Sequence, residues 1–201
     1  MTVVTPGRPA GGAIRVIAGS ARGVMLRGPR SEGTRPTTSR LRESLFAMLE
    51  SAGVDFSRVL DLYAGSGALG IEALSRGEGR ATFVEADHRA AATIRENLER
   101  ARLAERGEVV VARVGRWRAP AGVAYTLVVA DPPYHDATSW AAIEASVEDA
   151  LEAEATVAVE HDARQPPPPA FAGRPLWRQR RQGDGAVAIY QPHSPAGEDS
   201  T

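Results

Sequence analysis

Strand-like apolar runs alternate with helix-like segments from residue 58 onward, and this alternation constrains the fold more than any other feature of the chain. The apolar runs occupy residues 59–62, 81–85, 109–112, 125–130 and 156–160. Helical composition fills the intervals at 68–76, 88–103 and 139–152. Repeated strand–helix units build a mostly parallel sheet whose two faces are covered. We therefore expect an α/β, Rossmann-like fold.

Both ends of the chain add β structure to this alternating region. Runs at 14–18 and 24–27 predict a small β-hairpin, and an amphipathic helix follows with Thr38 or Ser39 as its N-cap. Near the other end, runs at 176–181 and 186–190 flank a Gly-Asp-Gly turn and predict an antiparallel hairpin. The expected architecture is a mostly parallel seven-stranded sheet with a C-terminal antiparallel hairpin, plus the N-terminal hairpin and helix.

Charge is distributed unevenly along the 201 residues, although the formal net charge is only −1. The first 50 residues hold eight arginines and three acidic residues, hence +5, which leaves −6 for the remainder. A basic first quarter on an acidic body is typical of a module that faces nucleic acid. For any single arginine, a solvated surface position or protection of a hairpin edge is the simpler interpretation.

The chain contains no cysteine, which excludes a disulfide framework, a cysteine-ligated zinc site and a thiol nucleophile. His88 and His161 show no ligand spacing, so we expect no metal. Residues 1–12 lack the apolar core of a signal peptide, and no apolar run is long enough to span a bilayer. We therefore expect a cytoplasmic protein.

A carboxylate, two prolines and an aromatic ring follow the apolar run 125–130, as Asp131-Pro132-Pro133-Tyr134. The strand delivers them to the carboxyl edge of the sheet, where open α/β folds bind ligands. The prolines stiffen the turn. Such a turn can hold a flat, amine-bearing ring: Asp131 and a turn carbonyl accept hydrogen bonds from the amine, and Tyr134 covers the ring face. An ordinary loop with a capping Asp is the alternative.

A glycine-rich segment lies between the first strand of the alternating region and its helix. Gly65, Gly67 and Gly70 satisfy the pattern G-x-G-x-x-G, and Glu85 follows Gly65 by twenty residues, at the end of the next strand. In this pattern the glycines allow a tight turn and close approach, and the acid binds a ribose diol. The segment predicts a nucleoside-bearing cofactor but does not require NAD.

Two features favour S-adenosylmethionine over NAD. Asp61 precedes the glycine loop, where its carboxylate can serve the ammonium group of that cofactor but would repel a pyrophosphate. Asp61 can also pin the loop by hydrogen bonds, and the two roles can coexist. The second feature is the amine clamp of the 131–134 turn. No Asp or Asn follows the third strand to bind adenine, so we expect the backbone amide near Val114 to meet the ring edge.

The loop at residues 61–76 resembles class I S-adenosylmethionine-dependent methyltransferases. More narrowly, the chain resembles the RsmD family, which methylates the exocyclic N2 of guanine 966 in bacterial 16S rRNA. The similarity covers roughly residues 14–190 and includes Arg15-Val-Ile-Ala-Gly19, Gly33-Thr-Arg-Pro-Thr-Thr38, Arg42-Glu-Ser-Leu-Phe46 and Asp131-Pro-Pro-Tyr134. Ser39 stands where the family usually has Asp, which affects helix capping, and Arg113 where it usually has Asp or Asn, which affects cofactor affinity.

This resemblance implies S-adenosylmethionine as cofactor and 16S rRNA as partner, within a 30S subunit or an assembly intermediate. We also expect a monomer. The implied catalytic residues are Asp131, Pro132, Pro133 and Tyr134. The implied cofactor-binding residues are Asp61, Tyr63, Ala64, Gly65, Ser66, Gly67, Glu85, Ala86 and Val114. The implied RNA-binding residues are Arg15, Arg22, Arg35, Thr37, Arg40 and Arg42.

The expected organisation is a basic, RNA-facing extension at 13–52 and a catalytic domain at 53–191, between disordered tails at 1–12 and 192–201. Three other functions stay open. An amino-methyltransferase acting on adenine in DNA or on a protein glutamine would use the same clamp, because the clamp suits any planar amine. An NAD-dependent oxidoreductase would use the same glycine pattern. A silent RNA-binding module would retain the fold without the chemistry.

Overall fold

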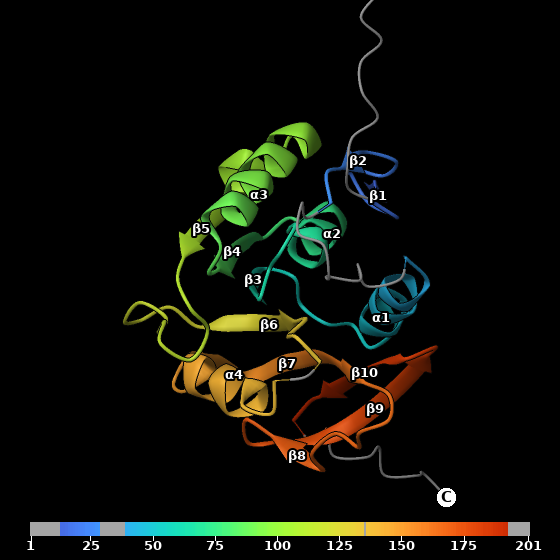
Figure 1. Cartoon of the computed structure of the whole chain (residues 1–201), viewed down its shortest axis with the longest axis vertical. Helices are drawn as coiled ribbons and strands as arrows, with labels where there is room; N and C mark the ends of the chain where they lie inside the picture. Colours follow the sequence, from blue (N-terminus) through green and yellow to red (C-terminus); the bar gives the residue numbers. More distant parts are fainter. Residues whose placement is uncertain (1–12, 29–38, 135, 193–201) are drawn as a thin grey trace, which may run out of the picture.

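The computed structural model describes residues 13–28, 39–134 and 136–192, and its centre is one large β-sheet (Figure 1). The strands of this sheet run in the order β5-β4-β3-β6-β7-β10-β9-β8. The first five strands in this order, from β5 to β7, are parallel to one another. The remaining strands, β10, β9 and β8, continue the sheet in antiparallel pairs. The predicted mostly parallel α/β fold with a C-terminal antiparallel hairpin is confirmed. The difference is an eighth strand, the two-residue β8 at the edge.

The strands of the large sheet are β3 (Arg58–Leu62), β4 (Arg80–Glu85), β5 (Gly107–Val111), β6 (Tyr125–Ala130), β7 (Leu151–Asp162), β8 (Ala170–Phe171), β9 (Arg174–Gln182) and β10 (Gly185–Tyr190). The helices are α1 (Ser39–Ser51), α2 (Ala68–Arg76), α3 (His88–Ala101), the short 3-10 helix η1 (Ala104–Arg106) and α4 (Ser139–Val147). The N-terminal hairpin consists of β1 (Ile14–Arg15) and β2 (Met25–Leu26). No helix among these is long and apolar enough to cross a membrane.

Two apolar cores lie on opposite faces of the sheet. One core joins the N-terminal hairpin, α1, α2 and α3 to strand residues such as Val59 and Val187. The other core joins α4 to Leu60 and Ala188, which directly follow Val59 and Val187 in the sequence. Successive strand residues point to opposite faces, so a strand buried on both sides reads as a continuous apolar run. The hairpin and α1 therefore pack into the same core as α2, the helix that follows the glycine-rich segment.

The end of the helix predicted at residues 139–152 and the start of the strand predicted at residue 156 are both wrong. The composition of residues 139–152 favoured a single helix, but α4 ends at Val147, and Asp149 turns the chain with a φ of 60°. From Leu151 the chain is already in β7, with Leu151 paired to Tyr125 of β6. Leu, Ala and Glu are strong helix formers, so pairing with the central sheet overrides local preference here. The long β7 places Glu160 close to the carboxyl edge of the sheet.

The expected tails at 1–12 and 192–201 fall outside the described residues, except for Pro192 at the end of the described chain. The predicted RNA-binding residues Arg35 and Thr37 also lie outside them, as does the expected N-cap Thr38. The division of the chain at residues 52 and 53 stays a prediction about function.

Candidate active site

The carboxyl ends of β3, β4 and β6 meet at one edge of the sheet, and each brings one carboxylate there. Asp61 lies near the end of β3, Glu85 ends β4, and Asp131 directly follows β6. β3 pairs with β4 on one side and with β6 on the other. The order of the strands therefore reverses at β3, and open α/β sheets bind ligands at such a switch point.

The glycine loop is shaped by three residues in the left-handed region, where φ is 57° at Tyr63, 56° at Gly65 and 76° at Gly67. A Cβ atom added at Gly65 would come no closer than 3.8 Å to a described atom, the Tyr63 carbonyl oxygen. The backbone at Gly65 therefore faces open space, as a cradle for a ligand requires. At Gly70 an added Cβ would lie 2.3 Å from Cε1 of Phe83. Gly70 thus allows α2 to pack closely on β4.

Glu85 joins the glycine loop to the next loop of the same edge. Its Oε2 accepts a hydrogen bond from the Gly65 amide at 2.8 Å, and its Oε1 accepts one from the Asp87 amide at 2.8 Å. A carboxylate has about four lone-pair sites, so each oxygen can accept a further bond. Glu85 is half-buried. Its geometry suits a ribose diol, because the carboxylate is already held in place by two backbone amides.

Asp61 is buried and holds the start of α2. Its Oδ2 accepts a hydrogen bond from the Gly70 amide at 2.8 Å. Burial raises the pKa of Asp61 well above its ordinary value, and the nearby carboxylates of Asp131 and Glu85 raise it further, against the effect of the Gly70 bond. Three acids so close together form a site that a cation stabilises and an anion destabilises. The carboxylates of Asp61 and Glu85, which flank the glycine loop, therefore suit the positively charged S-adenosylmethionine and disfavour a pyrophosphate.

The other expected cofactor residues lie along the same loops. The Ala64 amide donates to the Val84 carbonyl at 3.2 Å, which ties the loop to β4. The carbonyl of Ser66, a buried residue, accepts a bond from Nδ2 of Asn97 at 2.9 Å. Ala86 is exposed directly after β4, and Val114 is buried in the core on the α4 side. Asn97 is a residue that sequence reasoning missed, since nothing local distinguishes a buried helix asparagine.

The turn after β6 presents one acidic side chain and one carbonyl. Asp131 is half-buried and its amide donates to the Leu62 carbonyl at 3.4 Å, so the turn is attached to the end of β3. The Pro133 carbonyl accepts a bond from the Asp136 amide at 3.1 Å. No described residue donates to the carbonyl of Pro132. This arrangement leaves that carbonyl available as a second acceptor beside Asp131. His135 lies outside the described residues.

Tyr134 is anchored at its tip by a residue far away in the sequence. Its hydroxyl donates to Oε1 of Glu160 in β7 at 2.5 Å. A Cβ atom added at Gly185 would lie 2.7 Å from the Tyr134 hydroxyl oxygen, so β10 passes directly beneath the side chain. Burial raises the pKa of Tyr134 far above its ordinary value, and the neighbouring Glu160 contributes in the same direction. Sequence reasoning placed Tyr134 at the site but missed Glu160, because no local pattern connects the two.

The predicted RNA-binding arginines separate into two groups. Arg15, Arg22 and Arg40 are exposed, as an RNA contact requires. Arg42 is not: its side chain is only 2% exposed, with Nη2 donating to the Arg15 carbonyl at 2.7 Å and Nε 3.9 Å from Oε2 of Glu72. Burial lowers the pKa of Arg42. The prediction that Arg42 contacts RNA is wrong, because a guanidinium held in the interior cannot reach a phosphate.

Two buried residues of α2 attach the N-terminal hairpin to the rest of the fold. Glu72 accepts hydrogen bonds from the amides of Ile17 at 2.8 Å and Ala18 at 3.0 Å. Ser75 receives the Ala21 amide on its hydroxyl at 2.9 Å. A Cβ atom added at Gly19 would lie 1.8 Å from the Ser75 carbonyl oxygen, so only glycine allows this approach. The hairpin is consequently fixed relative to the helix that begins at the glycine loop.

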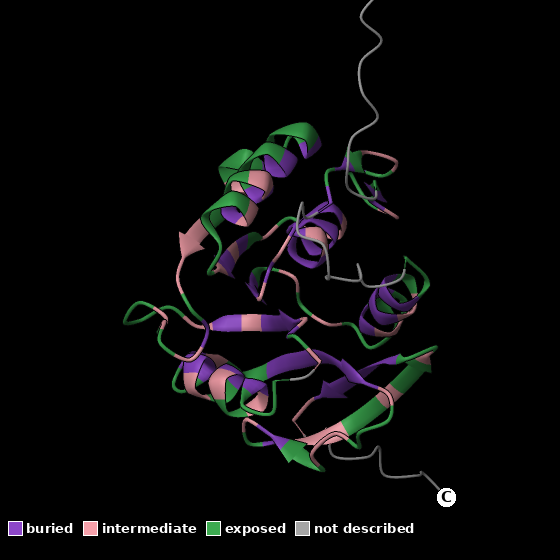
Figure 2. Ribbon diagram, in the orientation of Figure 1, coloured by how far each residue is buried: buried purple, intermediate pink, exposed green. Residues whose placement is uncertain are grey.

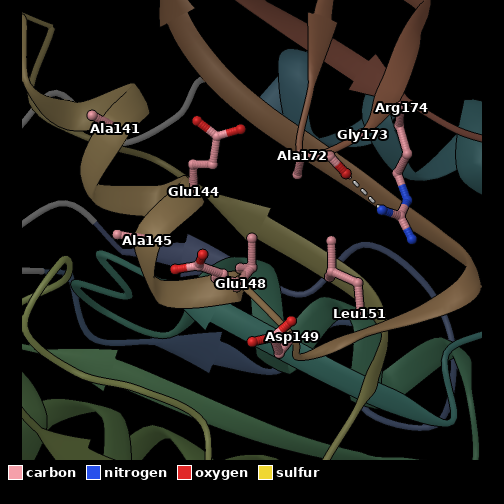
Figure 3. A pocket seen from close by; sticks show the side chains of 10 residues that line it. Ala141, Glu144, Ala145, Glu148, Asp149, Leu151, Ala172, Gly173 and Arg174 are labelled. Carbon is pink, nitrogen blue, oxygen red and sulfur yellow. Dashed lines mark hydrogen bonds between the residues drawn. The ribbon is translucent and has the colours of Figure 1, made fainter.

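A hollow of about 600 Å³ lies away from this edge, between α4, the start of β7 and the β8–β9 turn (Figure 3). Leu151 in its lining pairs with Tyr125, six residues before Asp131, so the hollow lies about 20 Å along the strands from the clamp. Its charged lining includes Glu144, Glu148 and Asp149, which would repel a polyanion. The guanidinium of its one lining arginine donates to backbone carbonyls. This hollow is separate from the carboxylate edge, the edge of the sheet where Asp61, Glu85 and Asp131 lie.

Comparison with known proteins finds relatives that match most of the chain. Residues 14–191 match the protein family described as Conserved hypothetical protein 95. Ribosomal RNA small subunit methyltransferase D of Escherichia coli strain K12 is 36% identical over 187 residues, which cover 92% of this chain and 93% of that protein. YlbH of Bacillus subtilis strain 168 is 35% identical over 182 residues, with 89% and 98% covered. The structure of the protein yhhF from Escherichia coli has a TM-score of 0.75 at 36% identity, covering 90% of this chain and 99% of that one.

Proposed function

We propose, because the chain belongs to the RsmD family of S-adenosylmethionine-dependent rRNA methyltransferases, that it methylates the exocyclic N2 of a guanine in 16S rRNA. The target within the family, guanine 966, is the position we expect. The observation that carries this proposal is the pair of acceptors at the end of β6, the Asp131 carboxylate and the Pro132 carbonyl, beside a cluster of acids. A planar amine with two N–H bonds fits this pair.

The cofactor would occupy the carboxylate edge. S-adenosylmethionine, when bound, supplies an electrophilic methyl group on a positively charged sulfur. Glu85, which two amides already hold in place, would accept the ribose hydroxyls. Asp61 would face the ammonium group, directly or through a water molecule, and the open backbone at Gly65 would lie against the cofactor. The amide of Val114 would meet the edge of the adenine ring.

The reaction requires that the amine of guanine become a nucleophile. Its lone pair is delocalised into the ring, and two acceptors on its N–H bonds favour the tetrahedral geometry that releases the pair. Asp131 and the Pro132 carbonyl would supply these acceptors and align the nitrogen with the methyl group. When the nitrogen takes the methyl group, with S-adenosylhomocysteine as the leaving group, Asp131 would accept the proton that the nitrogen sheds.

The guanine must leave its stack to reach the turn. Enzymes that modify bases flip the target nucleotide out and replace the lost stacking with aromatic side chains. Tyr134 would provide this surface, and its bond to Glu160 would hold the ring in one orientation. Exposed arginines of the N-terminal extension, Arg15, Arg22 and Arg40, would hold the RNA backbone, together with Arg35 and Thr37. Such contacts weaken as salt concentration rises.

The test is transfer of a labelled methyl group from S-adenosylmethionine to 30S subunits, naked 16S rRNA and duplex DNA, followed by mass spectrometry of the nucleosides. We expect N2-methylguanosine from rRNA, and the preferred substrate form shows whether ribosomal proteins present the target. Label in DNA adenine would contradict the substrate while retaining the clamp. Absence of transfer to all three substrates, with cofactor bound, would point to a protein glutamine or to a silent RNA-binding module.

A further inference from the structure

Strand β9 carries a row of exposed arginines that none of the assignments above uses. Arg178, Arg180 and Arg181 are exposed, and Figure 2 shows β9 exposed over much of its length beside the buried β10. None of the three makes an ion pair with a described residue, whereas other arginines such as Arg27 and Arg76 do. Isolated arginine charges on one strand are available to an anionic partner.

The register of the sheet places two of these arginines on the face of Tyr134. Val187 of β10 pairs with Glu160 of β7 on one side and with Arg180 of β9 on the other. Directly opposed residues of antiparallel strands project to the same face. Arg180 therefore shares a face with Glu160, which holds the Tyr134 hydroxyl. Two strand spacings separate the backbones of β9 and β7, which is about 10 Å.

Arg178 extends this row along the same face. It pairs with Ile189, which belongs with Val187 to the core on the α1 side. Residues two apart on a strand lie about 7 Å from each other. The Arg178 guanidinium also stacks over the ring of Trp177, with 4.4 Å from Cζ to the ring centroid. This stacking holds one of the two charges in a defined place.

Helix α1 brings a third exposed arginine toward the same region. α1 contacts both β9 and β10 (Figure 1). A Cβ atom added at Gly185 would lie 3.4 Å from Cδ2 of Leu41 as well as 2.7 Å from the Tyr134 hydroxyl oxygen. The first turn of α1, which carries the exposed Arg40, therefore approaches the start of β10 beside residues 131–134, the proposed catalytic turn.

We propose that Arg178 and Arg180 form a phosphate-binding surface for the RNA strand that enters the catalytic turn, with Arg40 as its continuation on α1. The inference rests on the proposed function and adds a second RNA contact region to the N-terminal extension. Arginine suits this role because its planar guanidinium binds phosphate oxygens through paired hydrogen bonds. Two guanidinium groups on one strand face can meet successive phosphates of one RNA strand. The surface would orient the flipped nucleotide toward Tyr134.

Edge protection is the competing explanation for these arginines. β8 pairs with β9 only at Pro175 and Arg174, so beyond residue 175 the side of β9 that faces away from β10 has no paired strand among the described residues. Charged side chains on such an edge prevent pairing with another chain. This explanation predicts aggregation of variants that lack the charges, without any change in RNA affinity.

The test is the salt dependence of RNA binding by the double variant Arg178→Gln/Arg180→Gln. Naked 16S rRNA serves as the probe in filter binding, and the full chain is used throughout. Each phosphate contact contributes about 0.7 to 0.9 to the slope of log affinity against log salt. We expect the slope to fall by about 1.4 to 1.8, with affinity at low salt reduced roughly tenfold or more and S-adenosylmethionine binding unchanged.

The matched control is Arg80→Gln/Arg100→Gln, which removes the same charge from exposed positions at the start of β4 and the end of α3. We expect the control to keep the slope of the wild-type protein. An equal loss in both double variants would overturn the inference, since it would reflect net charge alone. So would an unchanged slope in the β9 variant, with or without aggregation in size-exclusion chromatography. Failure of the wild-type protein to bind or methylate rRNA would instead contradict the proposed function itself.

Discussion

The glycine loop and the proposed catalytic turn lie side by side at the carboxyl edge of the sheet, but they are held in different ways. The glycine loop is fixed by backbone amides that bond to nearby carboxylates: Gly70 to Asp61, nine residues apart, and Gly65 to Glu85, twenty apart. In the turn, Tyr134 depends on a side-chain bond to Glu160, which belongs to another strand of the sheet. The loop is held along its backbone, whereas the turn is held at the tip of a side chain.

In the proposed function, this difference separates cofactor binding from base binding. The acids around the glycine loop suit a cation, whereas the turn offers hydrogen-bond acceptors and an aromatic ring to a neutral base. A change in either region should therefore affect one ligand much more than the other, and each prediction below tests that separation.

The largest expected effect is that of Asp131→Ala on methyl transfer. Loss of the carboxylate removes one of the two acceptors for the amine, and removal of one oriented group at a reacting centre costs about 10²–10³-fold or more in rate. We expect single-turnover transfer to fall by at least this factor. Asp136→Ala, which removes an exposed carboxylate from the same loop, is the matched control and should transfer at nearly the wild-type rate. A comparable loss in both variants would mean that the loop fold, and not the Asp131 acceptor, had been tested.

Asp61→Asn should weaken cofactor binding. The asparagine oxygen can still accept the Gly70 amide bond, so the loop retains its shape, but the negative charge is lost. Hydrogen bonds to charged groups contribute about 1.5–3 kcal/mol, so we expect roughly a 10- to 100-fold weaker affinity for S-adenosylmethionine in calorimetric titration. Unchanged affinity would assign Asp61 a purely structural role.

The same variant has a predicted pH dependence. Because burial raises the pKa of Asp61, the folded protein binds its proton more tightly than the unfolded chain does. The contribution of Asp61 to stability therefore falls as pH rises from its ordinary pKa, about 3.9, through the raised value. We expect urea unfolding to show Asp61→Asn gaining stability relative to the wild type over this range, by at most about 1.4 kcal/mol per pH unit. The opposite trend would indicate an ionised, stabilising Asp61.

Gly70→Ala should destabilise the fold while Gly65→Ala acts mainly on the cofactor. The added methyl at Gly70 would lie 2.3 Å from the Phe83 ring, and overpacking of this kind costs about 1–3 kcal/mol. At Gly65 the methyl has room but requires a left-handed backbone, at a cost of about 1–2 kcal/mol, and it intrudes on the cradle. Unfolding curves with and without S-adenosylmethionine distinguish the two. A cofactor-specific defect at Gly70 would contradict its packing role.

The smallest expected effects come from the Tyr134–Glu160 bond. Tyr134→Phe keeps the ring but loses its anchor, so we expect a few-fold rise in KM for rRNA with kcat less affected. Glu160→Gln keeps an acceptor and should be milder. It also removes the charge that helps to raise the pKa of Tyr134, so the phenol should ionise at a lower pH in spectroscopic titration of the four tyrosines. An unchanged tyrosine titration would mean that Glu160 does not control the ring.

Local patterns predicted the fold well. The strand at Tyr125–Ala130 and the helix at Ala68–Arg76 have the predicted bounds, because apolar runs and a terminal glycine mark them in the sequence. What failed depends on distant partners. Residues 148–152 have a helix-forming composition, but pairing with β6 places Leu151 and Glu152 in a strand. Arg42 points inward because its guanidinium bonds to the Arg15 carbonyl and lies near the Glu72 carboxylate. The Glu160 anchor was missed for the same reason.

The most direct test of separate roles is a paired measurement on Asp61→Asn and Asp131→Ala, with calorimetric cofactor affinity and single-turnover transfer at saturating cofactor for each. We expect Asp131→Ala to bind S-adenosylmethionine within about twofold of the wild type and to lose transfer. We expect Asp61→Asn to bind weakly and, once saturated, to transfer at close to the wild-type rate. If both variants lost both properties, the two regions would act as one unit, and the division between cofactor edge and catalytic turn would be contradicted.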